Sequence, residues 1–125
     1  MADPLVYALG LAVAGAALAG SVLPDTTARF LPETWLWSAA HAPVYVVLTA
    51  SVAGLLRSEP DGLLVSVVLV SLVGMGAEVA QPLWGRSASF VDYLCNEVGV
   101  ILGAMMTQWR RRTAIGAATG EEGKG

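Results

Sequence analysis

The chain has 125 residues, of which 55% are hydrophobic and 14% charged, and its mean hydropathy is +0.63. This composition is too apolar for an ordinary soluble domain of that length and favours an integral membrane protein. Ten acidic residues against seven basic ones give a net charge of −3, which argues against nucleic-acid binding. The single cysteine, Cys95, excludes an intramolecular disulfide.

Four apolar segments have the length of about 20 residues that a helix needs to cross a bilayer. They cover residues 5–23, 35–56, 63–83 and 90–109. The first follows no Lys or Arg and is longer than the apolar part of a signal peptide, so we expect a retained helix. Lipid requires every backbone polar group to be bonded internally, and no strand-like alternation of polarity is visible. The sequence therefore predicts an all-α integral membrane bundle of four transmembrane helices.

The connections between these segments are short, which predicts that successive helices are antiparallel neighbours in one domain over residues 1–113. Residues 114–125 are small, polar and rich in glycine, and we expect a disordered cytoplasmic tail.

Basic residues predict the orientation, because Lys and Arg near helix ends remain in the cytoplasm. With four spans both termini share one side, which holds Arg57, Arg110, Arg111, Arg112 and Lys124. Arg29 and Arg86 fall on the other side. We therefore expect a multi-pass protein of the cell membrane with both termini in the cytoplasm.

Polar side chains are placed at a common depth on three of the predicted helices. Counting about 1.5 Å per residue from the outer helix ends puts Glu78 about 8 Å deep. The same count puts His41 and Asn96 about 9 Å deep. The three residues are therefore expected at one level of the outer leaflet.

Spacing along two of the helices groups these residues further. Glu78 and Gln81 share one helix face, as do Asp92 and Asn96. An uncompensated charge at mid-bilayer costs about 2.5–3.5 kcal/mol, so such side chains face inward and pair. Arg86, in the short loop between the two helices, is the cation expected for Glu78 or Asp92, since Arg can bind carboxylates through two bonds. The pattern predicts a polar pocket that opens to the outer surface.

The order and spacing of these residues also carry a family resemblance. The pattern consists of His41 and Tyr45 upstream, then Glu78-x-x-Gln81, Arg86, Asp92, Asn96, Gly99 and Gly103. It resembles the VanZ-like family of small membrane proteins, in which Glu-x-x-Gln ends one helix, Arg follows in the loop, and Asp, Asn and small residues occupy the next helix. Family members often carry an Asp-Lys pair before the histidine, where this chain has WLWSAAH. The resemblance implies a multi-pass protein with an outward-facing polar site and identifies no reaction.

The candidate catalytic residues are His41 and Glu78. An imidazole can gain or lose a proton near neutral pH, so His41 can act as a general base, with Glu78 as a second proton acceptor. The alternatives are a satisfied inward-facing histidine and a buried ion pair between Glu78 and Arg86.

The candidate ligand-binding residues are Gln81, Arg86, Asp92 and Asn96. Asp92 has a structural alternative, because Ser89-x-x-Asp92 is a capping-box pattern at a helix start. Gln81 and Asn96 can instead form hydrogen bonds between helices, worth about 0.6 kcal/mol each in membranes.

Gly99 and Gly103 are expected to permit close helix packing, either within the bundle or in a homo-oligomer. His41, Glu78 and Asp92 could together ligate a divalent metal, but no ligand-spacing motif on one helix supports such a site. We therefore expect neither metal nor cofactor.

Two classes of function fit this pattern, and the sequence leaves open whether the protein is an enzyme. In the first, the pocket binds or modifies an amphiphilic envelope molecule, and Arg86 binds an anionic head group. In the second, the polar cluster is a structural latch in a membrane scaffold or accessory subunit. The lipid bilayer is a partner in both.

Overall fold

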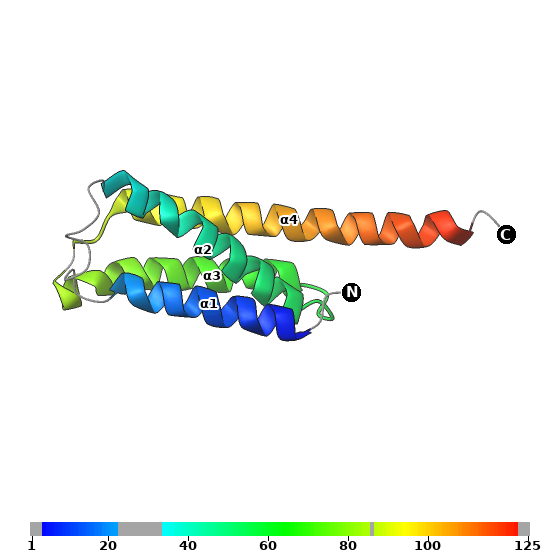
Figure 1. Ribbon diagram of the computed structural model, residues 1–125, viewed down its shortest axis with the longest axis horizontal. Helices are drawn as coiled ribbons and strands as arrows, with labels where there is room; N and C mark the ends of the chain where they lie inside the picture. The colour runs from blue at the N-terminus through cyan, green and yellow to red at the C-terminus, as the bar shows by residue number, and fades with distance from the viewer. Residues whose placement is uncertain (1–3, 23–33, 86, 123–125) are drawn as a thin grey trace.

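The computed structural model describes residues 4–22, 34–85 and 87–122. Within these ranges helices are the only regular secondary structure, which confirms the predicted all-α class. Its elements are α1 (Pro4–Val22), α2 (Thr34–Leu55), α3 (Gly62–Ala80), the short 3-10 helix η2 (Gln81–Trp84) and α4 (Phe90–Glu122). Successive α-helices run antiparallel, so α1 begins and α4 ends at the same end of the bundle (Figure 1).

The lengths and outer surfaces of the helices are compatible with a membrane protein. Among the described residues, three stretches are long and apolar enough to cross a bilayer, Ser38–Leu55, Gly62–Trp84 and Phe90–Ala117, and Pro4–Gly20 is a shorter apolar helix. Large hydrophobic side chains are exposed on α3 and α4, among them Leu64, Leu72, Leu102 and Met105. An apolar outer surface of this kind is disfavoured in water and suits a lipid solvent.

The third predicted segment changes its helix type near its end. Pro82 has no N–H to donate to the carbonyl of Glu78, so the α-helical bonding pattern is interrupted there. The chain continues as η2 and turns at Gly85, whose φ of 77° lies in the left-handed region that glycine adopts without steric cost. The prediction of one helix over residues 63–83 is therefore corrected at residues 81–83.

The fourth helix is longer than predicted. It continues past residue 109 and through the three arginines to Glu122, beyond the ends of the other helices (Figure 1). The expected disorder is wrong for residues 114–122, which contain no proline and include three alanines of high helix propensity. Residues 123–125 of the predicted tail lie outside the described residues.

Helix α2 packs against the other three helices and most extensively against α4. Two glycines of α4 permit this close approach. A Cβ on Gly99 would overlap the carbonyl oxygen of Ala42, and one on Gly103 would lie 2.8 Å from the carbonyl oxygen of Val46. The contact agrees with the packing role expected for these glycines and places it within the bundle.

The apolar core is small and lies between the helices. Its buried members are Ala14, Tyr45, Leu48, Val70 and Val100. None of these five core residues lies at the end of the bundle where α2 and α4 begin and α3 ends. Polar side chains lie at that end instead.

Candidate functional site

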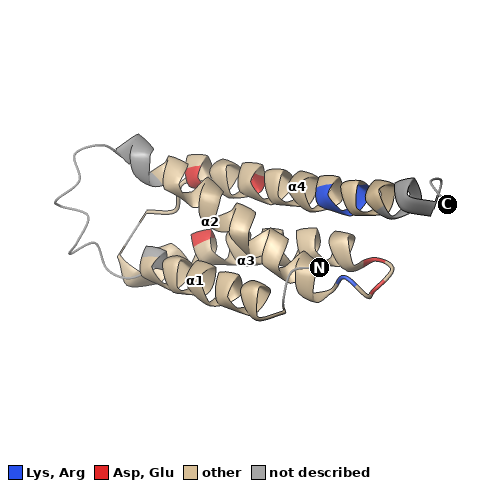
Figure 2. Ribbon diagram, turned by 45° about the vertical axis from the view of Figure 1, so that its right-hand side comes forward, with Lys and Arg blue, Asp and Glu red and all other residues tan. Residues whose placement is uncertain are grey.

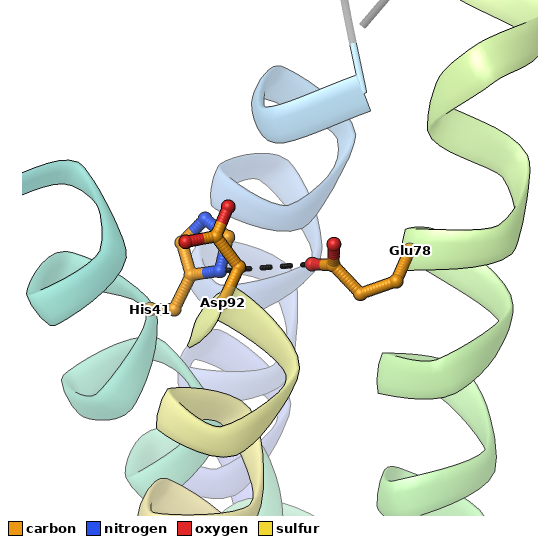
Figure 3. A group of neighbouring side chains, drawn as sticks. All are labelled: His41, Glu78 and Asp92. Carbon is orange, nitrogen blue, oxygen red and sulfur yellow. Dashed lines mark ion pairs between the residues drawn. The ribbon is translucent and has the colours of Figure 1, made fainter. Parts of the chain in front are cut away.

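Three helices bring one titratable side chain each to a common point. His41 comes from α2, Glu78 from α3 and Asp92 from the first turn of α4 (Figure 3). One ligand-type atom of each residue lies within 4.8 Å of the other two, and His41 Nδ1 is 3.9 Å from Glu78 Oε1. The sequence predicted a common depth for His41, Glu78 and Asn96. The structure brings His41 and Glu78 together with Asp92 instead, and we call these three residues the His41–Glu78–Asp92 cluster.

Glu78 is held in place by two donors from neighbouring segments. Its side chain is 8% exposed. Its Oε1 accepts a bond from Gln81 Nε2 at 3.3 Å, and its Oε2 accepts one from the backbone N–H of Ser89, also at 3.3 Å. A buried carboxylate needs such donors to offset its lost hydration. The bonds fix the position of Glu78 and tie the end of α3 to the start of α4.

Asp92 combines the two interpretations that the sequence left open. Its backbone N–H donates to Ser89 Oγ at 3.2 Å, which is the predicted cap at the start of α4. In a full capping box the Asp92 carboxylate would accept from the Ser89 N–H, but Glu78 occupies that donor. The Asp92 carboxylate instead accepts a hydrogen bond from Ser38 Oγ of α2. The cap therefore leaves the carboxylate available to the cluster.

Gln81 and Asn96 occupy different positions relative to this cluster. Gln81 is 1% exposed and supports Glu78 directly. Asn96 is also 1% exposed, one helical turn beyond Asp92 on α4, and neither of its amide atoms has a hydrogen-bond partner among the described residues. The interhelical hydrogen bond considered for Asn96 is thus not formed with any residue of the described ranges. Arg86, the expected cation of the site, lies outside the described residues.

Within the part of the chain that the structure describes, three buried polar atoms of α2 also lack a hydrogen-bond partner. They are His41 Nδ1, Tyr45 Oη and Thr49 Oγ1, all on α2. Buried polar groups are normally hydrogen-bonded, so a row of unsatisfied atoms marks a place where a ligand or water can bind. His41, Tyr45 and Thr49 follow at intervals of four, which places the row on one face of α2.

The space beside the cluster is small. A cavity of about 20 Å³ is lined by residues of α1, α2 and α3, among them Leu18, His41, Tyr45 and Glu78. It has room for about one water molecule. A larger ligand would therefore have to bind at the mouth of the cluster, with a single polar atom inserted.

The sequence analysis missed two polar contacts between helices. Ser38 contacts Asp92, and Ser71 Oγ donates to Glu97 Oε2 at 2.9 Å. The first had a signal in the sequence, because Ser38 precedes His41 by three residues and shares its helix face. The second had none, since nothing in the local pattern shows that Ser71 and Glu97 face each other.

The donor set of the cluster can hold a divalent cation. Imidazole and carboxylate groups are ordinary ligands of such ions, with metal–ligand distances of about 2.0–2.2 Å for zinc. Two atoms bound to one ion are thus at most about 4.4 Å apart. Atoms that lie within 4.8 Å of one another would need only a small side-chain adjustment. The lack of a spacing motif on one helix does not bear on this arrangement, because the three residues come from three helices.

Comparisons with known proteins found no match. No family model matches the chain, and no curated protein or solved structure matches it either. The resemblance to the VanZ-like family therefore remains a prediction that rests on the sequence pattern.

Proposed function

We propose that the protein is a VanZ-like integral membrane protein that binds the head group of an amphiphilic envelope molecule at the His41–Glu78–Asp92 cluster. In this proposal all four α-helices cross the bilayer and both termini are cytoplasmic. The three apolar spans support the membrane placement, and the arginines near the end of α4 support the orientation. The convergence of three titratable groups from three helices is the observation that carries the proposal.

The distance between His41 and Glu78 supports a ligand that inserts one polar atom. A hydroxyl oxygen about 2.8 Å from each partner bridges two atoms separated by the 3.9 Å between His41 Nδ1 and Glu78 Oε1. The adjacent cavity of about 20 Å³ has space for such an atom. A hydroxyl or amine of a head group bound there could give its proton to either residue. This arrangement gives more support to binding of a head group than to proton transfer.

A bound divalent cation is a second candidate, favoured by the short distances within the cluster. The described part of the site contains one imidazole and two carboxylates, and the carboxylates would repel an anionic head group. A cation held by these three side chains would offset the carboxylate charges and offer an anionic group a positive partner.

The metal candidate is tested by titrating Zn²⁺ and Mn²⁺ into the metal-free protein in mild detergent, with isothermal calorimetry as the measurement. We expect Asp92→Asn to weaken binding at least about tenfold, because it removes a ligand, and loss of a group that only supports a ligand commonly costs that much already. Asp61→Asn is the matched control, because Asp61 is an exposed carboxylate in the α2–α3 loop. Equal weakening by both variants would exclude a metal at the cluster.

The head-group proposal is tested by mass spectrometry of amphiphiles that copurify with the wild type, His41→Gln and Glu78→Gln. Glu97→Gln is the matched control, since Glu97 is a half-buried carboxylate outside the cluster. We expect both cluster variants to lose the bound amphiphile and Glu97→Gln to retain it. Thermal unfolding should show stability unchanged or raised in the cluster variants, because binding groups are commonly not optimised for stability.

The structural latch is the outcome that would overturn this proposal. If Glu78 mainly holds the bundle together, removing a buried charge partner should cost up to about 3 kcal/mol, and the double variant should recover part of that loss. Such coupling, with no amphiphile lost, would make the protein a scaffold or accessory subunit instead.

A further inference from the structure

A larger cavity lies at the other end of the bundle, where α4 extends beyond its neighbours. Its volume is about 310 Å³, at the lower end of the roughly 300–1,000 Å³ typical of small-molecule sites. Residues of α1, α2, α4 and the loop after α2 line it. Three of them are cationic, Arg57, Arg110 and Arg111, and no described lining residue is acidic. We call this space the arginine cavity.

The three arginines gather from two parts of the chain. Figure 2 shows the basic residues of α4 grouped toward the end of that helix, beyond its acidic residues, and a basic residue in the nearby α2–α3 loop. Like charges around one cavity repel each other, so a bound anion would be favoured there. Guanidinium groups match the geometry of phosphate oxygens and can bind them through two bonds.

One of these arginines is positioned by the backbone of α2. Arg111 Nη2 donates to the carbonyl oxygen of Ala53 at 3.2 Å, and Ala53 is completely buried. A guanidinium has five N–H donors, so one bond to the wall does not exhaust its capacity. The bond holds part of the positive charge in a defined place.

Apart from Tyr7 and Thr107, the rest of the cavity lining is apolar and continues into an apolar stripe. Gly54 and Met106 contribute to its wall, and a Cβ on Gly54 would overlap the ring of Tyr7, which shows how closely α1 approaches there. On α4, Met106 follows Leu102 and Val98 at intervals of four, and all three side chains are exposed. A ligand with a phosphate in the cavity could lay an acyl chain along this stripe.

We propose that the arginine cavity binds the phosphate head group of an anionic membrane phospholipid. The combination of cations, a volume that fits a head group and an adjoining apolar stripe favours a lipid over free phosphate. Basic pockets between helices at the membrane surface recognise anionic head groups through the same physics. The proposal rests on the membrane placement proposed above and is independent of the His41–Glu78–Asp92 cluster.

The test measures binding of dioleoyl phosphatidylglycerol to the full-length protein in mild detergent by native mass spectrometry. Dioleoyl phosphatidylcholine is the neutral comparison, and inorganic phosphate is added as a competitor. Arg110→Gln removes a charge from the cavity. Arg112→Gln is its matched control, because it removes an equal charge two residues away, where Arg112 lines a different space with Leu63 and Trp109.

We expect phosphatidylglycerol to bind more tightly than phosphatidylcholine. We also expect that millimolar phosphate does not displace the bound phosphatidylglycerol. Arg110→Gln should weaken phosphatidylglycerol about fivefold, the effect of about 1 kcal/mol per basic side chain at an anionic surface. Arg112→Gln should leave it unchanged. Ala114→Leu, which fills the cavity without changing charge, should weaken it as well.

Four results would overturn the proposal. Equal weakening by Arg110→Gln and Arg112→Gln would mean general attraction to a basic surface. Equal binding of the two lipids would mean that only the apolar surface matters. Displacement by millimolar phosphate would make free phosphate the ligand. A loss of phosphatidylglycerol binding in Glu78→Gln would assign that lipid to the other end of the bundle. If Glu78→Gln binds phosphatidylglycerol as the wild type does, this inference is separate from the proposed function.

Discussion

Replacing Gly99 by alanine tests whether the contact between α2 and α4 builds the cluster. The added Cβ would overlap the carbonyl oxygen of Ala42 and lie 2.7 Å from Tyr45 Cβ. One of these atoms belongs to the backbone and the other is a Cβ, so neither can move away by a side-chain rotation. Overpacking of this kind costs about 1–3 kcal/mol. Alanine recovers about 0.5–1 kcal/mol of helix propensity relative to glycine, which leaves a net loss between about 0 and 2.5 kcal/mol.

Gly76→Ala is the matched control, because Gly76 is also inside a helix and a Cβ there meets no atom within 4 Å. This variant should gain up to about 1 kcal/mol from helix propensity alone. The assay is reversible unfolding in mild detergent, followed by circular dichroism at a helix band. If Gly99→Ala were as stable as Gly76→Ala, the close α2–α4 contact would not exist as described, and the positions of His41 and Asp92 would lose their support.

Three further predictions concern single polar contacts and one turn, each measured by the same unfolding assay. Ser89→Ala removes the cap of α4 and should cost about 1 kcal/mol, while exposed Ser87→Ala should change little; equal effects would contradict a specific cap. Ser71→Ala should cost about 0.6 kcal/mol through its lost bond to Glu97, and a neutral result would mean that this bond contributes nothing. Gly85→Ala should cost about 1 kcal/mol or more, because its φ is 77°; an unchanged stability would show that the turn adopts another conformation.

The helices were predictable because their cause is local. An apolar run of about 20 residues has to bond its backbone internally in lipid, and this requirement can be applied without knowing any neighbour. The error in α4 has a local origin too. A glycine-rich composition suggested disorder after residue 113, but alanines and the absence of proline let the helix continue to Glu122.

The candidate site was partly predictable because antiparallel helices share a common end. Counting residues from that end gave His41 and Glu78 similar depths, and the structure places their side chains together. Depth is only one coordinate, however. The size of the space beside the cluster could not be predicted in this way, since its volume depends on how closely α1, α2 and α3 approach.

By itself, the sequence determined that this chain is helical, apolar enough for a membrane, and polar at one level of three helices. These properties depend on the order of residues along each segment. Only the tertiary structure decided which residues meet, because the rotation of each helix about its axis is set by packing against its neighbours. Gly99 against Ala42 is one such contact; it lets Asp92 of α4 reach Ser38 of α2, while Glu97 reaches α3. The same packing left a cavity beside the arginines that no local pattern could reveal.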